Sequence, residues 1–229
     1  FTGVSIGGCV GLSVCLGAVS TPDIQTGQSD SADLPDRQHA WNQVLATDDH
    51  GNHLPPRHRV LLLLRLRGNG PPDQAARESV ESALRSLERA FERSPNGLLF
   101  TLSYSPAYFS RFEAPLPDLV DLPEPRALAS FENPRFDTPD AVLHLASDHP
   151  QAVLQAEEAL RGNQETANGV QMAANFDGVF QVVDRRTGFV GEGLPQEHTD
   201  AAGIPDSAPI PDGAPMFMGF ESGFKHSQA

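Results

Sequence analysis

Three histidines in the N-terminal quarter of the chain form a dense group of potential metal ligands. His50, His53 and His58 follow directly after Asp48 and Asp49. Imidazole and carboxylate groups are common ligands of protein-bound metals. Their spacing, however, lacks the pair of histidines at i and i+4 on a helix that metalloproteases use. We therefore expect these to be solvated loop histidines and predict no metal site from them.

A second cluster lies near the C-terminus and combines glycines with a hydroxyl and a carboxylate. It reads Gly219, Phe220, Glu221, Ser222, Gly223. Glycine allows a tight turn whose backbone can approach a flat ligand closely. The nucleophile elbow of hydrolases has the pattern Gly-x-Ser-x-Gly, and the serine here stands one position too late for it. The cluster therefore favours a binding turn over Ser-His-Asp hydrolysis, with an ordinary Gly-Ser loop as the alternative.

Cysteine usage and charge exclude several other classes. Both cysteines, Cys9 and Cys15, lie in the first 21 residues, so the rest of the chain cannot form a disulfide, a zinc–thiolate site, an iron–sulfur site or a thiol nucleophile. The 16 basic and 30 acidic residues give a net charge of −14, which repels phosphate backbones and makes nucleic acid an unexpected partner. Only Lys225 is a lysine. This balance, together with the acid excess, suggests a haloarchaeal-like adaptation to high salt.

Residues 1–21 carry no charge and contain five glycines, so the segment is only weakly hydrophobic. A membrane-spanning helix needs about 20 strongly apolar residues. The composition therefore favours the core of an export signal, with a retained membrane anchor or a buried segment as alternatives. A weakly hydrophobic, glycine-rich core is typical of twin-arginine signals. We expect an exported protein, extracellular or at the cell surface, and we expect residues 22–58 to form a polar linker and arm.

Apolar periodicity defines the elements of the central region. Short apolar runs bounded by turn residues predict strands at 60–66, 98–104, 141–146 and 179–183. The 4-3-4 spacing from Val80 to Phe91 predicts an amphipathic helix that Asp73 caps and that ends near Ser94. A second helix is expected over 150–160 and a short one over 106–112.

The resulting order, β-α-β-β-α-β, predicts an α+β fold of the ferredoxin-like (split βαβ) type over residues 59–185. One antiparallel sheet should be covered on one face by two helices. Residues 113–140 hold six prolines and form too long a loop for a simple connector, so we expect it to line a site or wrap an interface. Residues 186–229 are expected to be a connector and the start of a second half.

The order of elements and several short sequence segments resemble those of the dye-decolourising (DyP-type) haem peroxidase superfamily. Four strings carry the resemblance, which spans residues 37–229: the arm segment at 37–41, the strand and aromatic turn at 99–112, the proline-rich loop leading into the strand at 115–148, and the motif at 217–224. The last string is similar to a Gly-Phe-x-Asp-Gly motif that opens the second half of these proteins.

The resemblance implies a dimeric α/β barrel type of architecture, whose first half is complete here and whose second half is truncated. It implies haem b as the cofactor, bound near Gly219, Phe220, Glu221 and Gly223, with the proximal histidine expected beyond Ala229. It also implies hydrogen peroxide and a reductant as substrates, with one-electron oxidation as the reaction.

One departure from the family motif bears on the activity. Ser222 stands where the family has the distal aspartate that helps to deprotonate peroxide. A serine hydroxyl has no accessible base form near neutral pH. The alternative is therefore a non-catalytic haem or small-ligand binding relative. A third hypothesis is a structural exported domain that forms homo-oligomers through its sheet faces.

Overall fold

The computed structural model describes residues 23–27, 41–114, 116–117, 120, 122–191, 193–200 and 210–216. The expected export segment, 1–21, and the motif, 217–224, lie outside these ranges. Among the described helices, none combines the length and the apolar character that crossing a bilayer would require.

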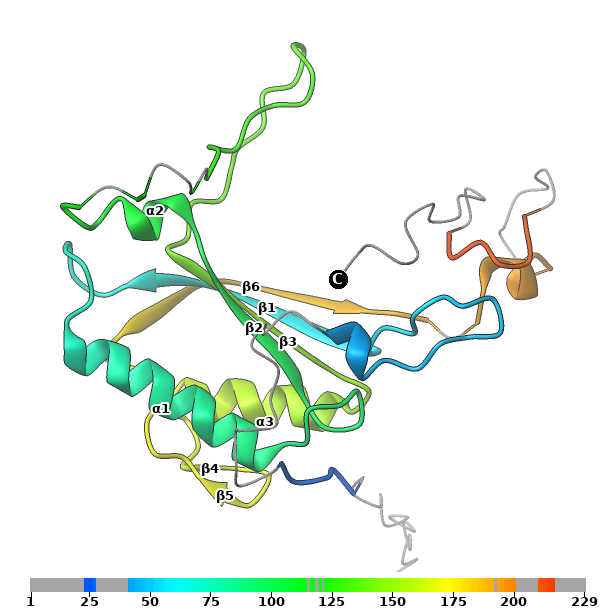
Figure 1. Ribbon diagram of the computed structural model, residues 1–229, viewed down its shortest axis with the longest axis horizontal. Helices are drawn as coiled ribbons and strands as arrows, with labels where there is room; N and C mark the ends of the chain where they lie inside the picture. The colour runs from blue at the N-terminus through cyan, green and yellow to red at the C-terminus, as the bar shows by residue number, and fades with distance from the viewer. Residues whose placement is uncertain are drawn as a thin grey trace, which may run out of the picture.

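A four-stranded antiparallel sheet forms the centre of the structure (Figure 1). Its strands are β1 (His58–Leu66), β2 (Leu99–Tyr104), β3 (Ala141–Ser147) and β6 (Phe180–Phe189). Their spatial order is β2-β3-β1-β6, with every neighbouring pair antiparallel. The predicted α+β class and the split βαβ order of elements are therefore confirmed. Closure into a barrel with a second half stays a prediction.

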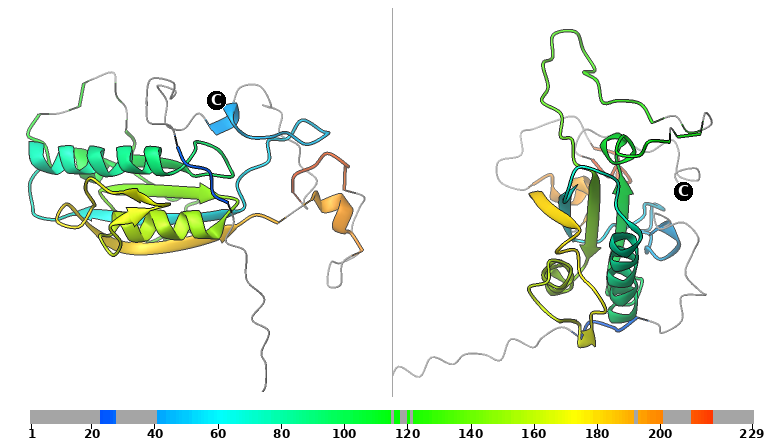
Figure 2. Two further views of the ribbon diagram at one scale, coloured as in Figure 1. Left: turned by 90° about the horizontal axis from the view of Figure 1, so that it is seen from below. Right: turned by 90° about the vertical axis from the view of Figure 1, so that its left-hand side faces the viewer.

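Two helices cover one face of the sheet (Figure 2). Helix α1 (Gln74–Ala90) begins as predicted, because the carboxylate of Asp73 accepts a hydrogen bond from the amide of Ala76 at 2.8 Å. Helix α3 (Pro150–Leu160) begins with proline at its first position, where no backbone donor is needed. The core lies between these helices and the strands. Its largest fully buried aliphatic side chains are Leu62, Leu64, Leu87, Leu143, Leu145 and Leu160.

Strand β6 is longer than the apolar run that predicted it. The run ends at Val183, whereas the strand continues through Phe189. A bulge between its pairing with Leu63 and with Leu64 shifts the register. Beyond the bulge, Arg185 points to the helix face, where it binds the buried carboxylate of Glu157 on α3 at 2.7 and 2.9 Å. An edge strand tolerates such charges because one of its sides is solvated.

A small hairpin between α3 and β6 was not predicted. Strands β4 (Thr166–Ala167) and β5 (Val170–Gln171) are joined by Asn168 and Gly169, with φ of 45° and 77°. Asn-Gly is the preferred pair for such a turn. The side-chain amide of Asn168 donates to the carbonyl oxygens of Ile24 and Ala90, at 3.0 and 2.8 Å. The hairpin therefore ties the segment 23–27 to the C-terminal end of α1.

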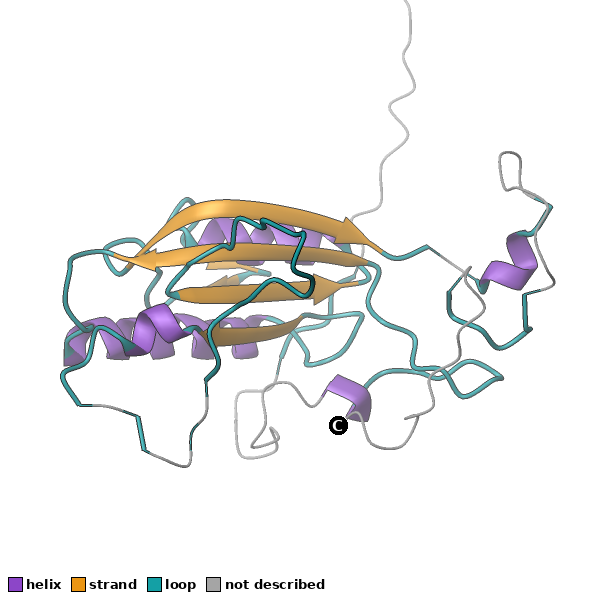
Figure 3. Ribbon diagram, turned by 90° about the horizontal axis from the view of Figure 1, so that it is seen from above, coloured by secondary structure: helices purple, strands orange, loops and turns teal. Residues whose placement is uncertain are grey.

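The loop between β2 and β3 begins with the short helix α2 (Pro106–Phe109) and then leaves the sheet on the side opposite to α1 and α3 (Figures 1 and 3). Its base is held by Asp140, the residue before β3. The Asp140 carboxylate binds Nε and Nη2 of Arg111 at 2.6 and 2.8 Å and accepts the amide of Leu66 at 2.7 Å. Arg111 also donates to the carbonyl oxygen of Gly68 at 2.9 Å. This bidentate pair, the Arg111–Asp140 clamp, joins α2 to the ends of β1 and β3.

We predict that Arg111→Met destabilises the protein by about 3–5 kcal/mol, because it leaves the buried Asp140 carboxylate without its cation. Urea unfolding followed by circular dichroism measures the loss. The matched control is Arg67→Met, which removes the exposed ion pair of Arg67 with Asp177 and should cost less than about 1 kcal/mol. Equal losses in both variants would contradict the structural role of the clamp.

Candidate functional site

The sheet face that α1 and α3 leave uncovered, called here the open face, carries both apolar and polar side chains. Side chains alternate between the two faces of a strand, and the core residues define the helix side. The registers then assign these residues to the open face: Leu99, Thr101 and Ser103 of β2; Val142, His144 and Ala146 of β3; Arg59, Leu61 and Leu63 of β1; Asp184 and Arg186 of β6. The face is mostly apolar at its centre and charged towards β6.

His144 occupies the middle of the open face, between Thr101 on β2 and Leu61 on β1. Strand alternation directs its side chain away from those of Leu143 and Leu145. It is nevertheless half-buried, because the indole of Trp41 packs on the imidazole with ring centroids 4.9 Å apart at 41°. Trp41 begins the short 3-10 helix η2 (Trp41–Gln43) in the N-terminal arm. No local signal predicts this contact, which joins residues 103 positions apart.

The environment of His144 keeps its imidazole neutral. Burial and, to a smaller extent, the positive charge of Arg59 together lower the pKa of His144 to about 4. A neutral imidazole offers one nitrogen as a donor and one as an acceptor. Within the described part of the chain, neither ring nitrogen has a hydrogen-bond partner. His144 is therefore a polar group with free bonding capacity on a largely apolar surface.

The N-terminal arm contacts residues 210–216, the segment that precedes the motif. Thr47 and His53 form an isolated bridge, and the Asp48 carboxylate between them accepts the amides of His50 and Asn52 at 3.0 and 2.8 Å. The Asn52 side chain donates to the carbonyl oxygen of Gly213 at 3.1 Å. Ile210 and Ala214 of the same segment are buried. Residues 210–216 are thus fixed on the arm that carries Trp41.

Hydrogen bonds also keep the Asp48 side chain of this arm in its charged form. Burial raises the pKa of Asp48, but the hydrogen bonds from the side chain and backbone of Asn52 and from the backbone of His50 outweigh it, so the pKa is lowered overall. Asp48 remains a carboxylate that organises the turn. Of the three histidines considered as ligands, His50 and His53 are exposed and His58 begins β1. Among the described residues, no three His, Cys, Asp or Glu side chains gather closely enough to hold a metal ion.

The predicted site residues Gly219, Phe220, Glu221, Ser222 and Gly223 lie outside the described residues. The structure shows that Gly213, which precedes the motif, is hydrogen-bonded to Asn52 of the arm. The described parts of the candidate site are thus the open face, the arm with Trp41, and the segment that leads into the motif.

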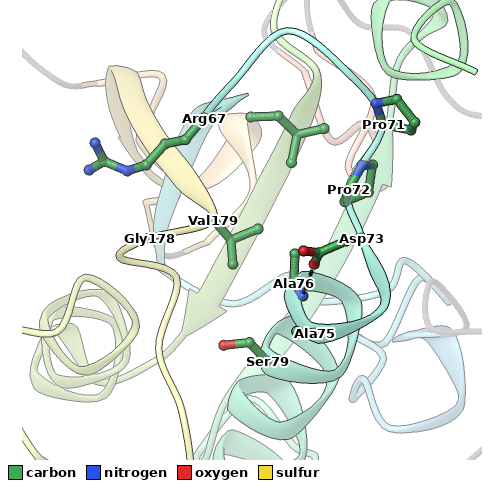
Figure 4. Close-up of a pocket in the computed structure, with 10 residues that line it drawn as sticks. Arg67, Pro71, Pro72, Asp73, Ala75, Ala76, Ser79, Gly178 and Val179 are labelled. Carbon is green, nitrogen blue, oxygen red and sulfur yellow. Dashed lines mark hydrogen bonds between the residues drawn. The ribbon is translucent and has the colours of Figure 1, made fainter.

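A separate hollow of about 440 Å³ lies at the N-terminal end of α1 (Figure 4). Pro71, Pro72 and Val179 line it together with Asp73 and Arg67. The two charged residues are already engaged, Asp73 with the helix amide and Arg67 with Asp177 at 3.0 Å. The hollow therefore offers no free charged group to a ligand.

Comparison with known proteins gives a family but no function. A model of a protein family of unknown function (DUF7405) matches residues 56–229. No curated protein matches the chain.

Solved structures similar to the chain include three peroxidase-related proteins. The encapsulated DyP-type peroxidase from Mycobacterium smegmatis has 16% identity and a TM-score of 0.40, over 67% of this chain and 46% of that one. DtpA from Streptomyces lividans has 16% identity and a TM-score of 0.43, over 69% and 42%. A dye-decolorizing protein from V. cholerae has 14% identity and a TM-score of 0.40, over 73% and 50%. The chain spans at most half the length of these three proteins.

We predict that His144 makes stability depend on pH. An unfolded histidine has an ordinary pKa of 6.5, whereas the folded value is about 4. Between these values the unfolded state binds more protons, so stability is complete above the unfolded value and falls as the pH drops from 6.5 towards 4. Urea unfolding at several pH values should show a smaller loss for His144→Gln than for the wild type. The exposed His53→Gln is the control and should keep the wild-type slope; identical slopes in all three proteins would contradict the burial of His144.

Proposed function

Because the chain belongs to DUF7405, a family of unknown function, we propose its function from the open face and the motif. We infer an exported haem-binding protein of the peroxidase type, in which the open face forms one wall of the haem site. The observation that carries this proposal is a neutral histidine at the centre of an apolar sheet face, covered by Trp41 of the arm that also binds Gly213.

The residues present fit a flat apolar cofactor that carries carboxylates. Leu61 and Val142 offer aliphatic contact on the open face, and Arg59 lies on the same face to pair with a propionate. Ligand sites are typically apolar surfaces with a few placed polar groups, as here. Haem, when bound, supplies peroxide-dependent one-electron oxidation. The protein contributes the apolar wall, the charge and a proton-accepting group.

The role of proton acceptor matters because the motif has Ser222 where an aspartate is expected. A serine cannot take the proton of hydrogen peroxide. The imidazole of His144, with a pKa of about 4, is about as strong a base as an ordinary aspartate, whose pKa is about 3.9. One ring nitrogen of His144 can therefore accept the proton that Ser222 cannot. The resulting cation would lie next to Arg59, which favours its prompt release.

Trp41 restricts access to this group. Its indole covers the imidazole, so a ligand reaches His144 beside Trp41 or by displacing it. The arm would then act as a cover over the site, which excludes water from the apolar wall. Since the chain has only one tryptophan, its fluorescence reports directly on this position.

We predict that haem added to the full chain produces a Soret band and quenches the emission of Trp41 at a ratio of one to one. Added hydrogen peroxide should then change the spectrum and oxidise a dye. His144→Gln should keep the Soret band and lower the rate of peroxide-dependent oxidation by about 100-fold, the lower range for a lost proton acceptor. His53→Gln is the matched control and should behave like the wild type.

Three outcomes separate the hypotheses. A Soret band without any change on adding peroxide favours the non-catalytic haem binder, the alternative that Ser222 supports. A Soret band without quenching of Trp41 places haem away from the open face. The absence of a Soret band contradicts haem binding and leaves the fold without this function.

A further inference from the structure

Strand β6 forms one edge of the sheet, and its outer side is unpaired within the described part of the chain. It comes last in the order β2-β3-β1-β6, and residues 184–189 are all exposed. Edge strands are commonly protected by proline, by lysine or by a bulge. The bulge of β6 lies before Asp184, and residues 184–190 contain neither proline nor lysine. This stretch therefore presents a regular edge to a further strand.

The ladder with β1 shows which backbone groups of this stretch face outward. In an antiparallel pair, every second residue exchanges hydrogen bonds with the neighbouring strand. The amide of Val190 donates to the carbonyl oxygen of Arg57 at 2.8 Å, so Gly188, two residues earlier, faces β1 as well. Thr187 and Phe189 alternate with these positions. They therefore direct their amides and carbonyl oxygens away from the sheet.

Apolar side chains flank the same edge on the helix side of the sheet. Thr187 pairs with Val60 of the core, so Thr187 and Phe189 both point to this side. Phe189 is 82% exposed there. Helix α3 runs along this edge (Figure 2), and its Leu154 is 50% exposed, one turn before the Glu157 that binds β6. Two large apolar side chains thus lie beside a strand with outward backbone groups.

Charge does not oppose the approach of a second copy at this flank, although the whole chain carries −14. Residues 150–161 and 180–190 together hold three acidic and three basic residues. Asp137, which binds Arg186 at 2.7 Å, adds one negative charge and brings the flank to −1. Two such flanks repel each other only weakly.

The side chains of β6 decide where a two-fold axis between two copies can lie. An axis at Arg185 or at Arg186 would set like charges opposite each other. An axis at Thr187 would need the outward amide of Arg185, which already donates to the carboxylate of Asp184 at 2.8 Å. An axis at Gly188 avoids both obstacles and pairs every outward group that remains.

We propose that two copies of the chain form a symmetric dimer by pairing their β6 strands antiparallel, with the two-fold axis at Gly188. Thr187 of each copy then exchanges backbone hydrogen bonds with the partner's Phe189. Gly188 lies opposite its own counterpart, at a position where the two strands come closest. Nothing in one copy lies within 4 Å of the Cβ position at this glycine, so the partner strand has room there.

The same pairing buries the apolar side chains of the flank. Each Phe189 lies opposite the partner's Thr187, and such pairs of an aromatic with a β-branched side chain stabilise sheets. Glu157 of α3 binds Arg185, and Leu154 lies one turn from it towards the start of the helix, beside Thr187. The incoming phenyl ring therefore covers Leu154. The result is one continuous sheet of twice four strands, with the helices of both copies on the same side.

A disulfide tests the position of the axis in the full chain. In a background with Cys9→Ser and Cys15→Ser, Gly188→Cys should form a covalent dimer on mild oxidation, because directly opposite Cα atoms lie about 4.5 Å apart. The matched control is Gln181→Cys, an exposed position on the same strand, whose two copies would lie roughly 50 Å apart. It should remain monomeric on a non-reducing gel. Equal crosslinking of both variants would contradict the proposed axis.

Sedimentation equilibrium tests the interface without any crosslink. The wild type should have twice the 24.6 kDa mass of one chain. Phe189→Lys and Leu154→Lys should each raise the dissociation constant by about 10-fold or more, because a charge then enters the buried contact. Phe131→Lys and Leu128→Lys change side chains that are 89% and 96% exposed on the β2–β3 loop, and they should leave the dimer unchanged. Circular dichroism checks that all four variants keep the fold.

Two results of this experiment would overturn the dimer. One is a wild type that stays monomeric up to its solubility limit. The other is a dimer that the two loop variants weaken as strongly as the variants of β6 and α3. Neither readout requires haem, so a failure here is distinguishable from a failure of the proposed function.

Discussion

The ion pair between Arg111 and Asp140 is the constraint on which both the central sheet and the long β2–β3 loop depend. The Asp140 carboxylate, directly before β3, accepts hydrogen bonds from the amide of Leu66 on β1 and from two guanidinium nitrogens of Arg111 on the turn after α2. Its side chain is almost fully buried, so its charge is stabilised only while all these elements stay in register. The same residue ends the long loop. The loop can therefore project from the sheet without loosening the strand that carries His144.

The two faces of the sheet differ in how firmly they are covered, because different segments pack on them. On the helix side, α1 and α3 bury a continuous aliphatic core, and the buried pair of Glu157 with Arg185 fixes α3 against the edge strand. On the open face, the contact described comes from the N-terminal arm. Trp41 packs on His144, and residues 210–216 pack on the arm. A face covered by an arm can be uncovered at lower cost than one covered by helices, since fewer buried contacts are lost. This asymmetry is what makes the open face the better candidate for binding.

Local patterns predicted the two long helices and the four strands of the main sheet, but not the contacts that build the site. The helix at Pro150–Leu160 and the cap at Asp73 were predictable because both follow from neighbouring residues. The extension of β6 was missed because the apolar run ends at Val183 and is followed by the charged residues Asp184, Arg185 and Arg186. Their charges are in fact satisfied by Glu157 and Asp137, which are distant in sequence. The hairpin at Asn168 and Gly169 carries the Asn-Gly turn signal, but its two-residue strands are too short to form an apolar run. The contact of Trp41 with His144 had none.

The near absence of lysine has a structural reason as well as a compositional one. Arg111 reaches both oxygens of Asp140 and the carbonyl oxygen of Gly68 with a single planar group. Arg186 likewise joins Asp184 on its own strand to Asp137 at the base of the loop. A lysine ammonium is a single point charge and cannot hold two oxygens of a carboxylate and a further carbonyl in fixed directions. In a chain with so large an acid excess, each bridging arginine orders several oxygens at once. A small number of cations can then organise an acidic protein without neutralising it.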